Sequence, residues 1–412
     1  MKTYKLSDIY TEDKISFQQD RYEQAAKSFE EIFSCKSERF FSAPGRTEVG
    51  GNHTDHNLGK VLAAGVSLDV IAATLKTDDS IIEVKSAGFD KDVVDITCLD
   101  LVENEKNSSA ALIRGVCRGF VDRGYKIGGF KAYTTSNVLK GSGLSSSAAF
   151  EVLIGTILSC LYNDGEVSDV EIAQIAQFAE NEFFGKPSGL MDQMASSVGG
   201  FITIDFKDVK NPVINKLEFD FVSSGHSLCI VDTKGNHADL TPEYAAIPVE
   251  MKSVAKLFGK SELRGVSRSQ LLERVAEIRE KCGDRALLRA LHFVDENDRV
   301  DAEANALSNG NFAEFLSVVN CSGDSSYKYL QNIYANKSPD EQGLSVGLYL
   351  AQSVLQGSGA ARVHGGGFAG TIQAFVPDEK LPSFINVMDK TFGDGSCHVL
   401  TVRPHGGVEV NL

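Results

Sequence analysis

The sequence predicts an α+β protein with two closely packed lobes. Its 412 residues, of which 42% are hydrophobic, are more than one ordinary domain needs for its core. Segments with the helical period and segments with alternating polarity follow one another without an internal repeat or a low-complexity stretch. We place the lobe boundary at the end of a short strand that follows two glycines. Residues 1–205 then form the first lobe and residues 206–412 the second.

The first half begins with helical periodicity and then changes to strand character. Apolar residues at helical spacing predict a helix over 8–35. A short apolar segment at 40–43 enters a glycine-rich loop over 44–59, and alternation over 61–75 predicts a strand. We expect 81–85 to pair with this strand in antiparallel fashion across a polar turn. Further patterns predict helices over 109–122, from the glycines at 141–143 to 161, and over 167–184, with strands over 130–135 and 201–206.

The second half mixes helices and strands in the same irregular way. The patterns predict helices near 247–258, 268–280 and 341–356, and strands over 228–233 and 371–376. No stretch approaches the roughly 18–20 uncharged apolar residues of a membrane span. The N-terminal residues also lack the apolar run of a secretory signal. We therefore expect a protein without a membrane association.

Charge and cysteine usage narrow the compartment and the partners. The formal net charge of −15 argues against nonspecific nucleic-acid binding, which depends on basic patches. The eight cysteines are scattered, and no CxxC pair suggests a zinc site or a disulfide framework. They predict buried free thiols in a reducing cytosol, and hence a cytoplasmic protein. The oligomeric state stays open between monomer and dimer.

The strongest local signal is a stretch of glycines and serines ahead of a helix. It reads Leu139-Lys140-Gly141-Ser142-Gly143-Leu144-Ser145-Ser146-Ser147-Ala148-Ala149. Glycines let a backbone approach a ligand closely, and the free amides of a helix N-terminus attract anions. Hydroxyl groups are available there to ligate magnesium. The stretch predicts a polyphosphate site, although a serine-capped helix is the plain alternative, and no Gly-Lys-Ser/Thr makes it a Walker A loop.

A second glycine-rich stretch occurs near the C-terminus, over Val363-His364-Gly365-Gly366-Gly367-Phe368-Ala369-Gly370. It matches GxGxxG, but a dinucleotide-binding turn needs a strand before it and a helix after it. The following residues 371–377 alternate in polarity and end in proline, which predicts a strand. We reject a Rossmann fold and interpret the stretch as a loop that lets a backbone or a ligand pass close by.

A polar loop lies ahead of the first predicted strand of the chain. Its residues Gly50-Gly51-Asn52-His53-Thr54-Asp55-His56-Asn57-Leu58-Gly59 follow Ala43-Pro44-Gly45-Arg46 closely. Such a cluster can offer several hydrogen bonds to the hydroxyl groups of a sugar. A metal site at His53, Asp55 and His56 fits no standard ligand spacing. A purely structural loop rich in Asn and Asp is the remaining alternative.

Taken together, these stretches resemble the motifs of the galactokinase branch of the GHMP kinases. The 43–59 loop is similar to the Gly-Arg…Gly-Glu-His-Thr-Asp-Tyr-Asn galactose loop of that family. The serine-rich stretch resembles its phosphate loop, and residues 363–370 its C-terminal glycine loop. Gly189-Leu190-Met191-Asp192-Gln193 resembles Gly-Ile-Met-Asp-Gln, and Ala179-Glu180-Asn181-Glu182 has the place of a magnesium-binding glutamate. The resemblance runs from about residue 40 to 376.

The resemblance implies a two-lobed GHMP kinase fold with ATP and a sugar in the cleft between the lobes. It also implies that the C-terminal strand can fold back across the lobe boundary. The implied activity is ATP-dependent phosphorylation of the anomeric hydroxyl of galactose, with Mg²⁺ as the metal. Asp192 would be the catalytic carboxylate, and Arg46 would hold it ionised. Ser147 and Glu180 would ligate Mg²⁺, while the nucleotide contacts would be Ser86, Gly141, Ser142, Gly143, Leu144, Ser145, Ser146 and Ser147. The sugar contacts would be Asn52, His53, Thr54, Asp55 and Tyr244.

The chain departs from the family pattern mainly in the sugar loop. Asn52 stands where the family has the Glu that meets the C6 hydroxyl, Glu48 replaces Asn, and Gly50 replaces a large aliphatic residue. In the two other loops, Leu139 replaces the proline of the phosphate loop and His364 replaces a threonine. Because Asn can donate to a carboxylate that Glu would repel, galacturonate or another C6-modified sugar is an alternative substrate. A non-catalytic galactose and ATP sensor, and a kinase for mevalonate or homoserine, are further alternatives.

Overall fold

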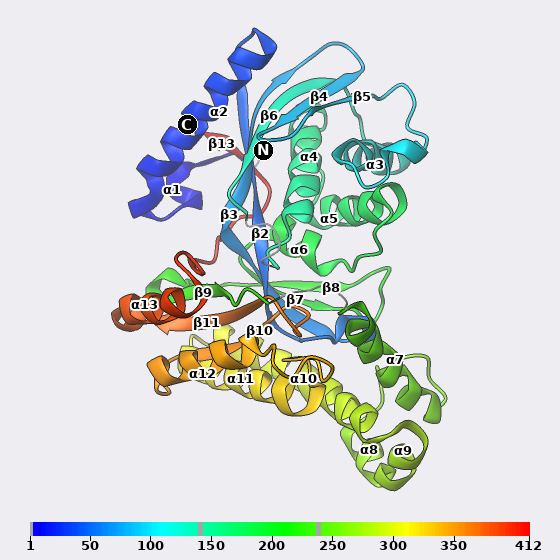
Figure 1. Cartoon of the computed structure of the whole chain (residues 1–412). Coiled ribbons are helices and arrows are strands. Elements are labelled where there is room, and N and C mark those ends of the chain that lie inside the picture. The colour runs from blue at the N-terminus through cyan, green and yellow to red at the C-terminus, as the bar shows by residue number, and fades with distance from the viewer. Residues whose placement is uncertain (1–2, 139–142, 236–239) are drawn as a thin grey trace.

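The computed structural model describes residues 3–138, 143–235 and 240–412. Within them, strands form two sheets (Figure 1). The larger sheet has nine strands in the order β1-β13-β2-β3-β6-β4-β5, with β7 and β8 attached through β3, and the smaller has the order β10-β11-β9-β12. The strands are β1 Thr3–Lys5, β2 Arg39–Gly50, β3 Lys60–Lys76, β4 Ile81–Ser86, β5 Lys91–Asp95, β6 Phe130–Ser136, β7 Phe201–Asp205, β8 Val213–Leu217, β9 His226–Asp232, β10 Ala360–His364, β11 Thr371–Pro377, β12 Cys397–Leu400 and β13 Val408–Asn411.

Helices cover both faces of the larger sheet. Figure 1 shows α2 along one face and α3 to α6 on the other, and α12 and α13 pack on the smaller sheet. The α-helices are α1 Leu6–Ile9, α2 Ile15–Phe33, α3 Ser109–Asp122, α4 Ser146–Tyr162, α5 Asp169–Phe178, α6 Met191–Val198, α7 Thr241–Leu257, α8 Arg268–Glu273, α9 Val275–Cys282, α10 Asp284–Ser308, α11 Phe312–Ser325, α12 Gly343–Leu355 and α13 Leu381–Phe392. Mixed helices and sheets of this kind confirm the predicted α+β class.

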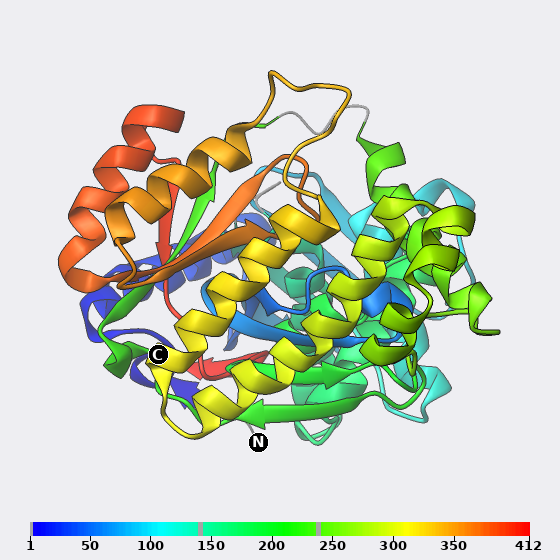
Figure 2. The same ribbon diagram turned by 90° about the horizontal axis from the view of Figure 1, so that it is seen from below.

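The longest of the described helices, α10, lies in the second half of the chain. Figure 2 shows α10 and α11 side by side, and the two helices are in contact. Helices α7, α8 and α9 pack against α10 away from the sheets and share an apolar core with it. The 25-residue helix α10 was not among the predicted elements. Its buried side includes charged residues such as Arg289, Glu296 and Glu303, which obscures the apolar stripe of an ordinary surface helix.

Helix α4 is the central helix of the first half. Its residues from Ala148 to Leu161 are almost all buried, because α4 packs against β2 and β3 on one side and α5 and α6 on the other. A helix that is apolar around its whole circumference has to be enclosed in this way. This burial fixes the N-terminus of α4, where the phosphate-loop serines lie, against the middle of β2.

Strand β2 differs from the prediction and positions the site. A short segment over 40–43 that enters a loop over 44–59 was expected, but β2 covers Arg39–Gly50. Its pairing with β3 shifts register twice, between Pro44 and Arg46 and between Glu48 and Gly50. Such bulges let a glycine-containing segment stay in a sheet while they re-aim the neighbouring side chains. Part of the predicted sugar loop is therefore strand, and Arg46 lies directly after the first shift.

Three predictions of the secondary structure were wrong in detail. β4 (81–86) does not pair with β3; it lies between β5 and β6 and runs parallel to β6. The insertion of β6 beside β3 is a long-range pairing that local patterns do not report. The helix expected over 8–35 is divided into α1, a 3₁₀ turn at 12–14 and α2, and the helix expected over 268–280 breaks at Arg274 between α8 and α9.

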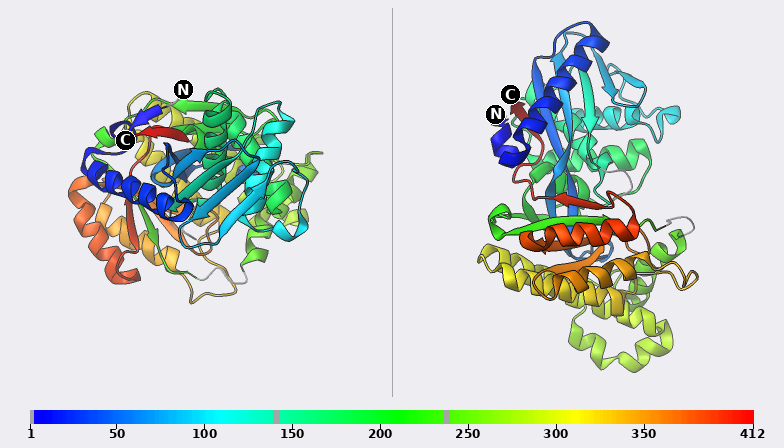
Figure 3. Two further views of the ribbon diagram at one scale, coloured as in Figure 1. Left: turned by 90° about the horizontal axis from the view of Figure 1, so that it is seen from above. Right: turned by 60° about the vertical axis from the view of Figure 1, so that its left-hand side comes forward.

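Two strands from the second half of the sequence, β8 and β13, belong to the larger sheet. β13 pairs with β2 in antiparallel fashion and with β1 in parallel, so the two ends of the described chain lie together (Figure 3). β8 (213–217) also pairs with β7 in the larger sheet. The larger sheet thus contains strands from beyond residue 205, and the expected boundary at that residue stays a prediction.

The searched residues contain no helix that is long and apolar enough to cross a membrane. All eight cysteines are free thiols, as predicted. Their predicted burial holds for Cys117, Cys160, Cys229 and Cys397, but Cys98 and Cys321 are exposed.

Candidate active site

An ion pair between Arg46 and Asp192 forms the centre of the site. Arg46 lies in β2, and Asp192 lies in the first turn of α6. The guanidinium Nε and Nη2 donate to the two carboxylate oxygens at 2.7 and 2.6 Å, and Ser145 Oγ donates to Oδ2 at 2.7 Å. Burial by itself raises the pKa of Asp192, but the charge of Arg46 and these hydrogen bonds outweigh it and hold the pKa below its ordinary value. The carboxylate is ionised and fixed in orientation.

The phosphate loop packs directly on the strand that carries Arg46. A β-carbon at Gly45 would lie only 2.9 Å from the carbonyl oxygen of Leu144, so this close approach requires glycine. Arg46 N donates to Leu144 O at 3.1 Å, and Arg46 Nη1 donates to the carbonyl of Gly143. The buried side chain of Leu144 anchors the loop in the core. Residues 45–46 of β2 and residues 143–144 of the phosphate loop are therefore in direct contact.

The described part of the phosphate loop ends in a helix N-terminus that faces the ion pair. The predicted phosphate contacts Gly141 and Ser142 lie outside the described residues, whereas Gly143 to Ser147 lie within them. Ser145 has a left-handed conformation (φ 55°), and α4 begins at Ser146. The amides of a first helical turn have no carbonyl partner in their own helix and carry the positive end of its dipole. Because Ser145 also touches Asp192, an anion at this tip would lie next to the ionised aspartate.

Glu180 lies on the other side of the phosphate loop. It belongs to a one-turn π-helix at Ala179–Phe184, which continues α5, and its side chain is buried. Ser147 Oγ lies 3.2 Å from Glu180 Oε1, and Lys186 Nζ donates to the same oxygen at 2.8 Å. The structure thus brings together Ser147 and Glu180, which the resemblance implies as metal-binding residues.

These two residues fit a magnesium site in their chemistry. A carboxylate and a hydroxyl are hard oxygen donors, and Mg²⁺ in nucleotide sites takes further ligands from phosphates and water. Within the part of the chain that the structure describes, no three His, Cys, Asp or Glu residues cluster closely enough to hold a metal by themselves. A site completed by the substrate's own phosphates is consistent with that finding.

Gln193 and Glu151 lie behind this carboxylate, and neither was predicted as a site residue. Gln193 Nε2 donates to Glu180 Oε2 at 2.8 Å and to Glu151 Oε2 at 3.2 Å. Burial and then the charge of Glu180 raise the pKa of Glu151 well above its ordinary value. The available signal was a single carboxyl group in the otherwise apolar stretch of α4. Gln193 connects Glu180 to the helix that carries Asp192.

Asn52 does not face an open sugar position in this structure. The side chain is fully buried, and its Nδ2 donates to Glu48 Oε1 at 2.9 Å and to Gly365 O at 2.8 Å. Its Oδ1 accepts from Asn332 Nδ2 at 2.8 Å and from Ser326 Oγ at 3.3 Å. The amide has two hydrogens and one oxygen, and all of them are in use. The predicted sugar contact through Asn52 would therefore require several buried bonds to break.

Of the other predicted sugar-loop residues, Thr54 and His53 bond to backbone carbonyls of the protein, whereas Asp55 is partly exposed. Thr54 is buried, with Oγ1 within hydrogen-bond distance of the carbonyls of Gly51 and Lys60. His53 has φ 57° and donates from Nε2 to Gly366 O at 2.9 Å, and burial lowers its pKa to about 4. Asp55 is only partly buried, and its Oδ2 would lie 3.3 Å from a β-carbon at Gly189. Asp55 thus faces the segment that leads into Asp192.

The C-terminal glycine loop is the surface on which the sugar loop rests. Besides Asn52 and His53, Tyr244 of α7 contacts it, with its hydroxyl donating to Gly367 O at 2.7 Å. A β-carbon at Gly366 would lie 2.7 Å from the Tyr244 ring. The loop connects β10 to β11, so the rejection of a Rossmann turn is correct. Its glycines serve close approach by other parts of the protein.

Two further positions named from the sequence, Ser86 and His364, are held by contacts of their own. Ser86, an expected nucleotide contact at the end of β4, accepts a hydrogen bond from Thr134 Oγ1 at 2.8 Å on the neighbouring strand β6. His364, noted in the sequence as a departure, is buried between Thr47 of β2 and Thr371 of β11, each 3.0 Å from a ring nitrogen. Gly143 of the phosphate loop packs against its ring.

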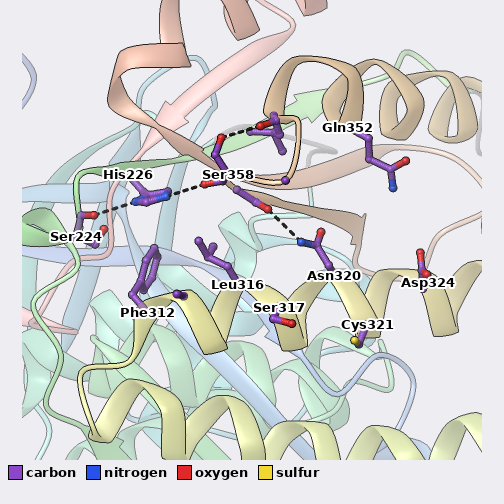
Figure 4. A pocket seen from close by; sticks show the side chains of 14 residues that line it. Ser224, His226, Phe312, Leu316, Ser317, Asn320, Cys321, Asp324, Gln352 and Ser358 are labelled. Carbon is purple, nitrogen blue, oxygen red and sulfur yellow. Dashed lines mark hydrogen bonds between the residues drawn. The ribbon is translucent and has the colours of Figure 1, made fainter.

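A cavity of about 720 Å³ lies apart from these residues, between α11 and the turn that precedes β10. Figure 4 shows His226, Phe312, Asn320 and Ser358 among its lining side chains. Several of the polar groups there bond to one another or to the turn, such as Asn320 Nδ2 to Gly359 O at 3.0 Å. None of the predicted site residues lines this cavity.

The chain is similar in sequence to known protein families and to individual proteins. The galactokinase galactose-binding signature matches residues 27–76, and the GHMP kinases N terminal domain matches residues 111–200. A galactokinase of Actinobacillus pleuropneumoniae is 33% identical over 360 residues, which cover 87% of this chain and 90% of that protein. The chain belongs to the galactokinase family. A Streptomyces coelicolor galactokinase is 30% identical over 88% of this chain and 91% of its own length.

The solved structures agree with this galactokinase assignment at the level of the fold. Lactococcus lactis galactokinase complexed with galactose superposes with a TM-score of 0.78 at 23% identity, covering 94% of this chain and 99% of that chain. Methanococcus jannaschii mevalonate kinase gives 0.62 at 16% identity, covering 89% and 98%. The predicted GHMP kinase fold is confirmed.

Proposed function

We propose that this protein is a sugar kinase that transfers the terminal phosphoryl group of ATP to the anomeric hydroxyl of galactose. The observation that carries the proposal is the ionised Asp192, held by Arg46 and Ser145 beside the N-terminus of α4. The relatives that cover most of this chain are named galactokinases, which supports galactose as the sugar.

In this reaction the N-terminus of α4 and Asp192 would have different roles. The first-turn amides of α4 and the phosphate loop bind the polyphosphate, since a helix N-terminus is an anion site. Asp192 accepts a hydrogen bond from the attacking hydroxyl and orients it. Because a lowered pKa makes Asp192 a weak base, it takes the proton late, after the bond to phosphorus has begun to form. Positioning and charge stabilisation are what phosphoryl transfer chiefly requires.

Ser147 and Glu180 are the residues that would hold Mg²⁺. When bound there, the ion supplies positive charge to the β- and γ-phosphates. Gln193 and Glu151 support Glu180 from behind, so that the carboxylate keeps its orientation. On the sugar side, Asp55 is the best placed of the predicted contacts, because it faces the segment before Asp192.

The alternatives have less support. Galacturonate as substrate depended on a free amide at Asn52, and that amide is engaged in buried hydrogen bonds. A sensor without activity would need neither the contacts of Arg46 and Ser145 with Asp192 nor that of Ser147 with Glu180. Free thiols in all eight cysteines fit a reducing compartment, and a cytoplasmic location stays our prediction.

The test is ADP release from ATP and Mg²⁺ with a panel of galactose, galacturonate, mevalonate and homoserine. We expect turnover with galactose, and ³¹P NMR should show the product phosphate on C1. Release of ADP with another member of the panel in preference to galactose would overturn the substrate assignment. ADP release with none of them, by protein that binds ATP, would support the sensor instead.

A further inference from the structure

Lys186 lies beside Glu180, and the family resemblance implies no role for it. Its Nζ is 2.8 Å from Glu180 Oε1, the oxygen that Ser147 also contacts. Its positive charge also reaches Asp192, because it is one of the charges that lower the pKa of that carboxyl. The ammonium therefore lies among the groups that would surround the terminal phosphates.

The backbone of Lys186 is held, while its side chain keeps freedom to move. Gly185 ends the π-helix with φ 88°, and Gly185 N and Lys186 N both donate to Glu180 O at 3.1 Å. Asn181 Oδ1 then accepts from Ser188 N at 2.7 Å, which clamps the returning segment. The Lys186 side chain, in contrast, is 55% exposed. The backbone of the loop is therefore fixed by hydrogen bonds, while the Lys186 side chain extends into solvent.

The two cations of the site differ in exposure and in how many partners hold them. The Arg46 guanidinium is committed to both oxygens of Asp192 and to the carbonyl of Gly143. An ammonium group has three hydrogens, and that of Lys186 uses one on Glu180. Each cation therefore keeps two N–H groups, but the Arg46 side chain is only 11% exposed, whereas that of Lys186 is 55% exposed. Lys186 is thus better placed than Arg46 to pair with an incoming phosphate.

We propose that Lys186 is a phosphate-binding catalytic residue. When ATP binds, its ammonium turns from Glu180 Oε1 to an oxygen of the terminal phosphates. Glu180 is then available for the metal, and the ammonium stabilises the charge on the transferred group. The exchange conserves the ion pairs of the site and makes and breaks no covalent bond. The inference rests on the proposed kinase function for its catalytic part, and on phosphate binding alone for the rest.

The experiment measures nucleotide affinity without any metal, in EDTA, by calorimetry on the full chain. Lys186→Met should weaken ATP binding about ten- to a hundredfold, the range expected for one hydrogen bond between charged groups. AMP lacks the terminal phosphates, so its affinity should stay within about twofold. With Mg²⁺ and galactose, kcat should fall by a similar factor, and Lys186→Arg should recover part of both effects.

Lys281→Met is the matched control. Lys281 is 56% exposed and pairs with Glu277 at 2.8 Å in α9, far along the chain from the site. It should change neither ATP affinity nor kcat. Thermal unfolding of all variants verifies that they fold, and Lys186→Gln serves if Lys186→Met does not.

Two results would overturn the proposal. Unchanged metal-free ATP affinity in the folded Lys186→Met variant would mean that Lys186 only neutralises Glu180. Equal losses for ATP and AMP would point to a general distortion of the site. If the native protein released no ADP with galactose, the proposed function would fail, whereas the comparison of metal-free affinities would still decide the role of Lys186.

Discussion

The phosphate side and the sugar side of this site differ in what their polar side chains contact. On the phosphate side, defined by Arg46, residues 143–147, Glu180 and Asp192, side chains bond to one another beside the N-terminus of α4, where we propose that phosphate binds. On the sugar side, defined by residues 52–55 and Tyr244, most side chains bind other parts of the protein. The residues of the sugar side serve largely to connect β2 and its loop with the C-terminal glycine loop.

The difference teaches that departures in a motif can be structural rather than chemical. Glu48 and Asn52 carry, in exchanged positions, the two residue types that the family pattern has as Asn and Glu, and here they are hydrogen-bonded to each other. Gly50 makes room for Glu303, whose carboxylate would collide with any β-carbon at that position. These changes accommodate one another in a buried cluster with Arg362, which pairs with Glu48 at 3.0 Å.

The largest effect should come from the phosphate side. Asp192→Asn keeps the shape but removes the charge that orients the hydroxyl and accepts its proton. We expect kcat with galactose to fall by about 10²–10⁴, the usual contribution of a positioned acid or base. ATP affinity, measured by calorimetry, should change far less. Retention of more than a tenth of the native kcat would show that Asp192 has no part in the reaction.

On the sugar side, Asn52→Glu should affect stability first. It places a second carboxylate beside Glu48 in a buried position and removes the donor that Glu48 uses. We expect the free energy of unfolding to fall by about 2–4 kcal/mol, as measured by urea denaturation.

The paired change Glu48→Asn with Asn52→Glu sharpens this comparison. It restores one carboxylate and one amide, so it should recover at least about 1 kcal/mol relative to Asn52→Glu alone. Strict additivity of the two single changes would show that Glu48 and Asn52 are not coupled.

Ser145→Ala tests the hydrogen bond that helps to keep Asp192 ionised. The bond is one of the causes that hold the pKa of Asp192 below its ordinary value, so without it the pKa should rise. A carboxylate is active above its pKa, so the acid limb of the kcat profile should move to higher pH in the variant. Identical acid limbs in the two proteins would assign that limb to another group.

The smallest effect should appear at Glu303. Burial raises the pKa of this carboxyl well above its ordinary value, so the folded protein binds a proton that the unfolded chain releases. Stability from this group is present below the unfolded pKa and is lost as pH rises through the folded pKa. Glu303→Gln should therefore lose less Tm between pH 5 and 8 than the native protein, by a few degrees. Parallel Tm curves would contradict this.

Much of the phosphate side could be predicted from the residues alone. Glycines and serines ahead of an apolar helix indicate an anion site whatever the rest of the chain does, since the helix N-terminus is local. The lysine at 186 was not predicted because only the turn that ends the π-helix brings its side chain back to Glu180. The carboxyl at 151 was not predicted because its partner Gln193 lies 42 residues away. Strand pairing failed for the same reason, since β6 joins β3 across more than 50 residues.

The sequence by itself determined the local chemistry of this protein: the helix tip, the strand-forming and helix-forming segments and the residue types of each loop. Only the tertiary structure decided which of those polar groups still face a ligand. Asn52 and Asp55 belong to one loop, yet the first is saturated by Glu48, Gly365 and Asn332, whereas the second faces Gly189. A side chain's hydrogen-bonding capacity is finite, and its partners come from distant segments whose positions the folded core alone sets.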